Sequence, residues 1–246
     1  MAEINRGLLR LYPESDIMIK RLFLLLLMFH SVMWIERAFG QRIKAEVIAG
    51  MNLSQVDGDL AYGFYKAGIN AGLGAIVPIG KNFSFSLETL YNQKGAYQGP
   101  FYADTNSLGN LLTGMYKLNI DYLEVPVMVQ YTDKDIIGAG LGVSYGRMVR
   151  VKEYEHDTLN RFTTLNSGVY NHDDFNVIFD VRFRIHKKLP RLKFNARYAY
   201  SIAKIRTRDF YTKSGVYDVT REQYNNLISL RLIYVLNEKA PLSTKK

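Results

Sequence analysis

The feature that most constrains this chain is an alternation of apolar and polar residues, with a period of two, in eight separate segments. Successive side chains of a β-strand point to opposite faces, so this period predicts strands whose two faces differ in polarity. Phe175, Val177 and Phe179 share one face of the sixth segment, for example, whereas Asn176 and Asp180 share the other. The eight segments are 43–53, 67–77, 83–92, 122–131, 137–145, 175–186, 192–201 and 228–236. No helical period of comparable length competes, and the fold is therefore predicted to be all-β.

The connections between these segments alternate strictly between short and long. The short connections are 78–82, 132–135 and 187–190, and the long polar ones are 54–62, 98–117, 152–173 and 207–222. All tight turns therefore lie at one end of the strands and all long loops at the other. This arrangement is typical of an even-stranded up-and-down barrel. The sequence thus predicts an eight-stranded antiparallel up-and-down β-barrel.

Alternation alone does not say which face is inside, because a soluble barrel turns its apolar face inward and a membrane barrel turns it toward lipid. Three features favour the membrane. The polar faces mix long charged side chains with Gly, Ser and Asn, as a narrow eight-stranded interior requires. The apolar faces are nearly free of charge over about ten residues, the height of the hydrocarbon layer. Tyrosines fall near the predicted strand ends, where interfacial girdles lie, namely Tyr91, Tyr131, Tyr145, Tyr200 and Tyr234. We therefore expect a small transmembrane barrel.

The first 40 residues have the pattern of a secretory signal peptide. Basic residues after Met18 precede an apolar run over 22–28 and a small-residue cleavage site at 38–40. The run is shorter than the roughly 20 residues that a spanning helix needs, and an amphipathic anchor helix is the alternative. We expect 1–40 to be an upstream extension plus a removed signal peptide, with Met1 or Met18 as the start. Residues 41–236 would form the barrel and 237–246 a polar C-terminal tail.

The composition excludes several classes of function. The chain has 246 residues and no cysteine, which excludes disulfide scaffolds, thiolate zinc sites and cysteine nucleophiles. The basic residues behind its formal net charge of +9 are scattered over turns, loops and strands. A nucleic-acid partner would need them clustered on one face. We therefore expect outer-membrane lipid, and no nucleic acid, as a partner.

Three stretches of the chain resemble a known family. They are Gly68-Ile-Asn-Ala-Gly72, Ser86-Leu-Glu-Thr-Leu-Tyr-Asn-Gln-Lys-Gly95 and Tyr122-Leu-Glu-Val-Pro126. They resemble the PorT-type outer-membrane β-barrel family of Bacteroidetes, in which an E-x-x-Y-x-x-K-G strand precedes a Y-L-E-x-P strand; segment 226–234 is similar to its closing strand. The resemblance implies a small Gram-negative outer-membrane barrel, often described as porin-like. The predicted architecture, eight strands with short periplasmic turns, places both termini in the periplasm. The resemblance also implies, more weakly, an accessory role in type IX secretion.

Charged residues with the parity of the predicted inner face form the candidate site. They are Glu88, Lys94, Glu124, Asp180, Arg182, Arg184, Arg197 and Arg231. A buried charge without a partner is costly, so we expect these groups to pair across the lumen as a structural plug. In particular, an arginine among Arg182, Arg197 and Arg231 should lie within ion-pair distance of Glu88 or Glu124. A proton or substrate relay is the alternative role for the same residues.

Two His-Asp pairs could suggest an enzyme at the barrel rim. His156-Asp157 and His172-Asp173 lie in the third long loop, and His186 ends a predicted strand. A polar loop without a rigid element gives such pairs no fixed geometry for catalysis. No HExxH or EF-hand spacing occurs, and the glycines at 68–74 and 138–142 alternate as strand residues do. We therefore expect no catalytic residue, no cofactor and no metal.

The sequence thus predicts a non-enzymatic outer-membrane protein of a Gram-negative bacterium with a charge-plugged lumen and four exposed loops. Its loops, or its wall, would contact envelope or secretion-system proteins; neither the partner nor the oligomeric state is specified by the sequence. The alternatives are a small porin-like channel and, as a third possibility, a rim enzyme that uses the His-Asp pairs. Single-channel conductance distinguishes the first alternative, and replacement of the four rim residues distinguishes the second.

Overall fold

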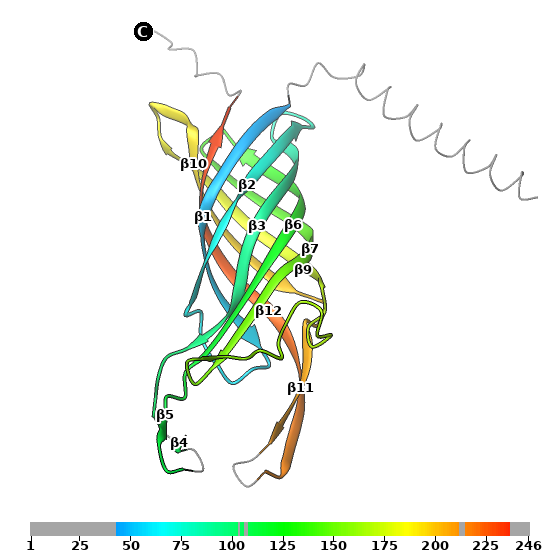
Figure 1. The fold of residues 1–246 in the computed structure, drawn as a ribbon. Helices are drawn as coiled ribbons and strands as arrows, with labels where there is room; N and C mark the ends of the chain where they lie inside the picture. The colour runs from blue at the N-terminus through cyan, green and yellow to red at the C-terminus, as the bar shows by residue number, and fades with distance from the viewer. Residues whose placement is uncertain (1–42, 103, 106–107, 212–214, 237–246) are drawn as a thin grey trace, which may run out of the picture. The chain divides into compact units, whose positions relative to one another are not determined.

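The computed structural model describes residues 43–102, 104–105, 108–211 and 215–236. Eight long antiparallel strands form a closed ring (Figure 1). They are β1 (Lys44–Asp57), β2 (Lys66–Pro78), β3 (Phe83–Gln98), β6 (Tyr116–Asp133), β7 (Ile137–Glu155), β9 (Asp173–His186), β10 (Leu189–Ser201) and β12 (Tyr217–Val235). Pairing of β1 with β12 closes the ring. The predicted eight-stranded antiparallel up-and-down barrel is therefore confirmed; the predicted signal peptide and C-terminal tail lie outside the described residues.

Each strand pairs with the next long strand along the chain, and the turns at one end are tight. The other end carries the long connections, which contain four short strands. These are β4 (Asp104–Thr105), β5 (Leu111–Leu112), β8 (Thr158–Leu159) and β11 (Arg206–Tyr211). β4 pairs with β5, β8 with β7, and β11 with β12, and the β4–β5 and β11–β12 hairpins project beyond the ring in Figure 1. Within the described residues, no helix has the length and apolarity needed to cross a membrane.

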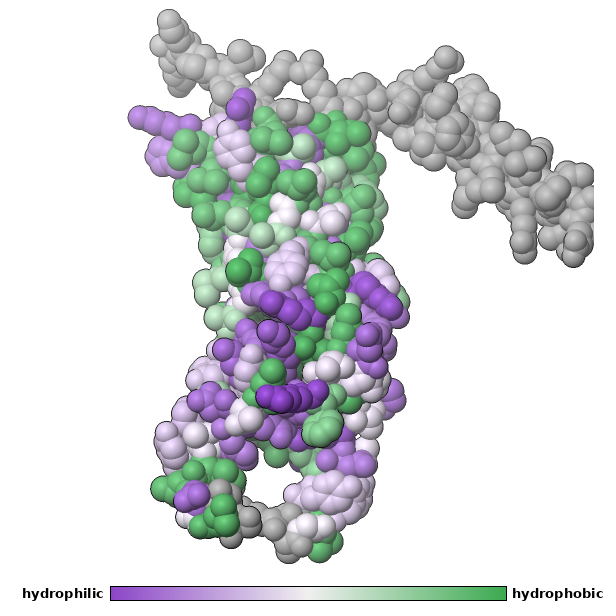
Figure 2. All heavy atoms as spheres, in the orientation of Figure 1, coloured by the Kyte–Doolittle hydropathy of each residue, from purple (hydrophilic) through white to green (hydrophobic). Residues whose placement is uncertain are grey.

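The outer surface of the barrel carries an apolar band on the half that is nearer to the tight turns (Figure 2). The band consists of outward-facing strand residues that are exposed although they are large and apolar. They are Val47, Met51, Ile69, Leu73, Phe85, Leu87, Leu123, Val125, Val129, Leu141, Val143, Phe175, Val177, Phe179, Phe183, Leu230 and Leu232. A continuous apolar surface of this extent is a membrane-contacting surface rather than a solvated one. The polarity expected of a transmembrane barrel is thus present.

Tyrosines and exposed ion pairs mark the edge of the apolar band on the long-loop side. On β3 and β6, the Tyr91 hydroxyl donates to Asp121 Oδ2 at 2.7 Å. On β7 and β9, Tyr145 and Arg147 both donate to Asp173 Oδ1 at 2.7 Å. An aromatic ring with a polar tip suits the interface between hydrocarbon and water. Tyr91 and Tyr145 lie within their strands and not at the ends, because these strands continue past the apolar band. The other three predicted girdle tyrosines lie near strand ends, namely Tyr131, Tyr200 and Tyr234.

The strands are longer than the sequence predicted at the long-loop end. β6 begins at Tyr116 and β7 ends at Glu155, so parts of the expected loops are strand. In these extensions the polarity is inverted: Leu118 and Ile120 are buried inside, whereas Lys117 is exposed. Beyond the membrane the outer face meets water, so the alternation becomes that of a soluble barrel. A prediction that looks for apolar residues at the outward-facing positions therefore ends these strands too early.

Candidate functional site: a charged interior

The barrel interior contains two clusters of buried charged groups. The first cluster comprises three acids and three arginines from β1, β3, β9, β10 and β12. They are Glu46, Glu88, Asp180, Arg182, Arg197 and Arg231, all of them buried. The formal charges cancel within the cluster. Ion pairs of opposite sign are the arrangement that a narrow, largely dry lumen tolerates.

Glu88 on β3 lies at the centre of this first cluster. Its Oε1 accepts a hydrogen bond from Arg197 Nη2 at 2.9 Å, and its Oε2 accepts one from Arg231 Nη1 at 2.8 Å. Arg182 Nη2 lies 3.9 Å from Glu88 Oε1, while Arg182 Nη1 donates to Glu46 Oε1 at 2.7 Å. One carboxylate therefore balances arginines from three different strands and links them across the lumen.

Asp180 on β9 completes the first cluster. Its Oδ2 lies 3.0 Å from Arg197 Nη2 and 3.6 Å from Arg231 Nη2. Arg231 Nε also donates to Asn195 Oδ1 at 2.8 Å, so that guanidinium is held from three sides. Such fixed, multiply bonded guanidinium groups fit a structural role better than a mobile gating role.

The second cluster is built around Lys94 on β3, which is fully buried. Lys94 Nζ lies 2.9 Å from Glu124 Oε2 on β6 and 2.9 Å from Asp174 Oδ2 on β9. Asn92 and Ser144 each donate to Glu124 at 2.7 Å. Ser201 and Asn225 donate to Asp174 at 2.6 Å and 3.0 Å. The lysine is thus shared by two acids that neighbouring hydroxyl and amide groups also hold.

The structure brings seven of the eight sequence-predicted lumen residues into these two clusters. Glu88 has arginines within ion-pair distance, whereas the partner of Glu124 is Lys94 and not an arginine. Arg184 is separate: it lies near the turn end of β9, is only half-buried, and its side chain makes no ion pair with the residues that the structure describes. Near the strand end the lumen meets solvent, so a guanidinium there needs no buried partner.

Sequence reasoning missed two acids of these two clusters, Glu46 and Asp174. Glu46 shares the inward parity of Asn52 on β1, and Asp174 shares that of Asn176 and Asp180 on β9. Parity could therefore have identified both residues. Asp174 lay at the border of a predicted loop, and parity does not reveal that Glu46 meets Arg182 of β9 across the ring.

Small residues make room for the charged groups. A Cβ added to Gly140 on β7 would lie 2.8 Å from Asp180 Oδ1 and 3.1 Å from Gln130 Cγ. Glycine is therefore needed at this position so that the neighbouring side chains can fill the interior. This supports the interpretation of 138–142 as strand glycines beside a crowded lumen.

An apolar layer occupies the barrel interior on the long-loop side of the two clusters. It consists of buried residues from the strand extensions and from the loops. They are Val56, Ala61, Ala96, Leu118, Ile120, Tyr122, Met148, Val151, Tyr170 and Ile205. Tyr170 comes from the third long loop, which therefore folds inward over the barrel. Packed apolar side chains leave few voids that water can enter.

A third set of polar groups lies at the loop end of this layer. Arg206 Nη1 donates to Glu153 Oε1 at 2.9 Å, and the Arg206 guanidinium lies 4.5 Å from the centre of the Tyr170 ring. The Tyr116 hydroxyl also donates to Glu153 Oε1, at 2.8 Å, and Thr163 Oγ1 donates to Glu153 Oε2 at 2.7 Å. These contacts fasten the third long loop to β6, β7 and β11.

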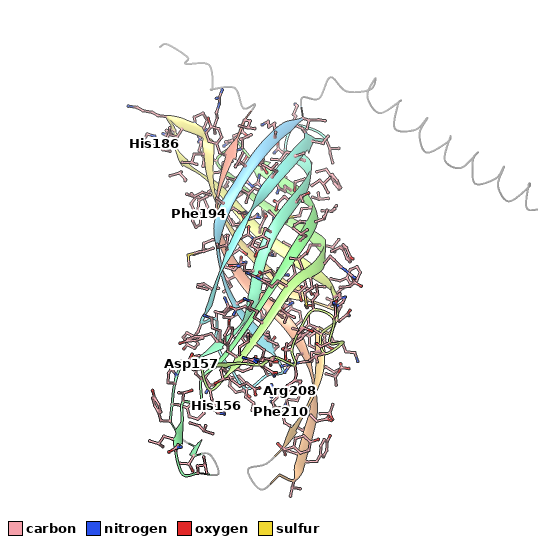
Figure 3. All side chains as sticks on the ribbon, in the orientation of Figure 1. His156, Asp157, His186, Phe194, Arg208 and Phe210 are labelled. Carbon is pink, nitrogen blue, oxygen red and sulfur yellow. The ribbon has the colours of Figure 1, made fainter. Side chains whose placement is uncertain are left out.

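The structure gives the histidines different surroundings. His156 and Asp157 have φ values of 50° and 65° and form the two-residue turn between β7 and β8, so the expected loop without a rigid element is in part a tight hairpin. His156 Nδ1 accepts a hydrogen bond from the backbone N of Gly114, whereas His172 Nε2 contacts the carbonyl of Leu165 at 2.6 Å. Figure 3 shows His186 at the opposite end of the barrel from His156.

The described partners of the His-Asp pairs are backbone groups, a tyrosine and an arginine. His172 Nδ1 lies 3.4 Å from Arg147 Nη2, and Asp173 Oδ1 already accepts hydrogen bonds from Tyr145 and Arg147. No hydrogen bond joins the two His-Asp pairs in the part of the chain that the structure describes. In the same residues, no group of three or more His, Cys, Asp or Glu side chains could hold a metal ion.

Comparison with solved structures finds small outer-membrane proteins. Neisserial surface protein A is 10% identical and has a TM-score of 0.45, covering 78% of this chain and 97% of that one. A major outer membrane protein from Thermus thermophilus is 13% identical, with a TM-score of 0.42, and covers 79% and 99% of the two chains. Ail, the attachment invasion locus protein of Yersinia pestis, is 13% identical, with a TM-score of 0.40, and covers 78% and 98%. No curated protein sequence matches the chain significantly.

A family model for the outer membrane protein beta-barrel domain matches residues 36–206, which is more than half of the chain. The matched range begins before β1 and extends to the start of β11. It covers the first seven of the eight long strands, and its description agrees with the apolar outer band and the polar interior of the barrel. The chain therefore belongs to the outer membrane protein β-barrel domain family.

Proposed function

We propose that this outer-membrane protein is a non-enzymatic, closed barrel whose long loops contact other components of the cell envelope. The observation that carries the proposal is the interior, where paired charges and an apolar layer fill the barrel. Ion pairs between strands on opposite sides of the ring favour a structural plug over a permeation path. The loops, by contrast, are long and present large exposed side chains such as Phe162 and Tyr62.

The orientation and processing of the chain are parts of this proposal. Short periplasmic turns and longer extracellular loops are the usual arrangement in bacterial outer-membrane barrels. We therefore place the tight turns, and both ends of the chain, on the periplasmic side. We also propose that 1–40 is an upstream extension with a signal peptide that is removed on export, and that 237–246 is a polar tail.

A narrower proposal concerns the identity of the partner. The E-x-x-Y-x-x-K-G and Y-L-E-x-P motifs support membership of the PorT-type group of Bacteroidetes barrels, and the partner would then be a component of a type IX-like secretion system. Tyr91, Lys94 and Glu124 of these motifs serve the interfacial girdle and the second charge cluster. The motif residues therefore support the barrel itself, and the partner would be recognised by the loops or the wall.

In-cell photo-crosslinking tests the proposed contacts. A photoreactive phenylalanine analogue replaces Phe162 or Tyr62 in the loops, Leu141 on the wall, or Met128 inside the lumen. Protein adducts at the loop positions, with none at Met128, would support contacts through the loops. Protein adducts at Leu141 alone would move the contact to the wall. Absence of protein adducts at all three outer positions would contradict the proposal.

A further inference from the structure

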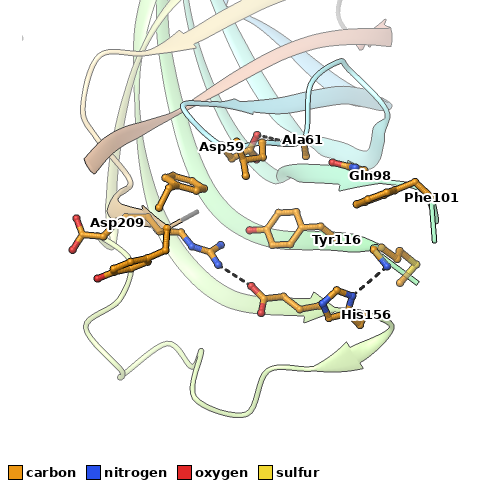
Figure 4. Close-up of a pocket in the computed structure, with 14 residues that line it drawn as sticks. Asp59, Ala61, Gln98, Phe101, Tyr116, His156 and Asp209 are labelled. Atoms are coloured by element: carbon orange, nitrogen blue, oxygen red, sulfur yellow. Dashed lines mark hydrogen bonds and ion pairs between the residues drawn. The ribbon is translucent and has the colours of Figure 1, made fainter. Parts of the chain in front are cut away.

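A cavity of about 450 Å³ opens at the long-loop end of the barrel (Figure 4). It is bordered by the β1–β2 loop, the beginning of β6, the β7–β8 turn and β11. Aromatic residues from these elements form much of its wall, among them Phe101, Tyr116, Phe210 and Tyr211. Its volume falls within the range of small-molecule sites, which combine apolar walls with a few polar groups.

Asp59 of the β1–β2 loop is the polar group that distinguishes this cavity. Its side chain lines the cavity although the residue is only 5% exposed. Oδ1 accepts a hydrogen bond from the backbone N of Ala61 at 2.9 Å, and Oδ2 is buried without a hydrogen-bond partner. A buried carboxylate with an unused acceptor is costly unless a cation or donor reaches it.

Asp59 also differs from the other buried acids of the described residues. Each of those acids has a lysine or arginine nitrogen within 4.0 Å, namely Glu46, Glu88, Asp121, Glu124, Glu153, Asp174 and Asp180. No such pair to a described residue forms at Asp59. Among the buried acids that the structure describes, Asp59 is thus the one without a basic partner, and it borders this cavity.

The other charged groups around the cavity already have partners. Arg208 Nη2 lies 3.0 Å from Glu155 Oε1, and Arg208 Nη1 lies 3.7 Å from Glu153 Oε1. His156 accepts the hydrogen bond from Gly114 described above, and Asp209 accepts one from Thr220 Oγ1. The unbalanced charge that faces the cavity is therefore negative.

We propose that this cavity binds a small organic cation, an amine with an aromatic or aliphatic body. Its ammonium group would pair with the Asp59 carboxylate, and its body would lie against the aromatic walls. Cations are also attracted to the faces of Tyr and Phe rings, so the aromatic walls would add to the attraction of the carboxylate. A divalent metal ion would need several oxygen ligands at once, and Asp59 is a single carboxylate. This ligand class goes beyond the proposed envelope contacts and does not depend on them.

Ligand affinity should depend on pH. Burial raises the pKa of Asp59 to about 7, and Asp57 adds to the rise; the Ala61 amide, Arg206 and Arg208 act in the opposite direction. A bound ammonium favours the ionised carboxylate, so amine binding should strengthen as pH increases from about 6 to about 8. Glu155, His156 and Asp209 also line the cavity, so the pH profile must be compared with that of a variant that lacks the Asp59 carboxyl.

Calorimetric titration of the full-length protein in detergent micelles tests this proposal. The probes are 2-phenylethylamine and its neutral counterpart 2-phenylethanol, which differ mainly in the ammonium group. The amine should bind at least about tenfold more tightly than the alcohol. Asp59→Asn should remove this preference and its pH dependence while leaving alcohol binding unchanged. Asp173→Asn, which removes an acid outside the cavity, should bind the amine as the unmodified protein does.

A second variant tests the aromatic wall. Phe210→Ala should weaken binding of both probes, since it removes part of the wall and leaves Asp59 in place. Equal affinity for amine and alcohol, unchanged amine binding by folded Asp59→Asn, or no binding of either probe would each overturn the proposal. None of these results would bear on loop crosslinks or on ion conduction. The amine-binding proposal can therefore be refuted without refuting the proposed envelope contacts, and the reverse also holds.

Discussion

Replacing Glu88 by glutamine removes the negative charge that three arginines share inside the barrel. The variant leaves Glu46 and Asp180 opposite Arg182, Arg197 and Arg231, so the first cluster gains one uncompensated positive charge. At 2.8 Å and 2.9 Å, with an effective dielectric constant of about 20, each direct contact of Glu88 supplies about 6 kcal/mol of Coulomb attraction. Desolvation of the buried charges offsets much of this. We therefore expect Glu88→Gln to lower the free energy of unfolding by about 3–5 kcal/mol.

Reversible urea unfolding in lipid vesicles, followed by far-UV circular dichroism and by gel mobility without boiling, measures this loss. Asp173→Asn is the matched control, because its ion pair with Arg147 is exposed to water and screened by it, and is therefore expected to contribute little to stability. Adding Arg231→Gln to Glu88→Gln restores neutrality, so the double variant should lose less than the sum of the two single losses. If Glu88→Gln and Asp173→Asn were equally stable, or the two lumen substitutions were simply additive, the charge-balance reasoning would be refuted.

Three other measurements test particular features of the structure. Gly140→Val should lower the free energy of unfolding by about 1–3 kcal/mol, because its Cβ would lie 2.8 Å from Asp180 Oδ1; Gly80→Val, with nothing within 4 Å of the added Cβ, should be neutral in the same unfolding assay. Val143→Lys should cost about 2–4 kcal/mol in lipid vesicles because it places a charge in the apolar band, whereas Val169→Lys in the exposed third loop should not. Because the pKa of Asp59 is raised from 3.8 to about 7, its protonated form stabilises the fold below pH 4, and this contribution, on the order of 4 kcal/mol at most, is lost as pH rises toward 7. Unfolding measured from pH 4 to pH 8 should show this decline in the unmodified protein relative to Asp59→Asn; parallel pH profiles of the two would contradict it.

Alternation in the sequence predicts the transmembrane part of this fold well because lipid imposes one rule on every strand. Residues such as Leu141 and Phe179 must be apolar since they face hydrocarbon, and their neighbours Gly140 and Asp180 must fit a narrow lumen. The rule fails beyond the membrane. Leu118 turns inward while Lys117 faces water, so the strand extensions have the opposite polarity and the lipid-facing pattern predicts loops there.

The partners within the interior are less predictable than its composition. Parity places Glu88 and Glu124 on the inner face of neighbouring strands, yet they belong to different clusters. Which groups meet depends on the register with which β1 and β12 close the ring, and alternation does not encode that register. Asp59 illustrates the remaining limit, since its cavity arises from the paths of several loops that have no periodic pattern.

Single-channel recording in planar lipid bilayers tests most directly whether the interior is closed. The full-length protein would be inserted from detergent, with insertion verified independently by its heat-modifiable gel mobility. An interior filled by paired charges and an apolar layer predicts no stepwise current above that of the bare membrane, across voltages of both signs. Stable, reproducible conductance steps from the unmodified protein, altered in size by Glu88→Gln or Lys94→Met, would show that ions pass through the charge clusters and would contradict the closed barrel.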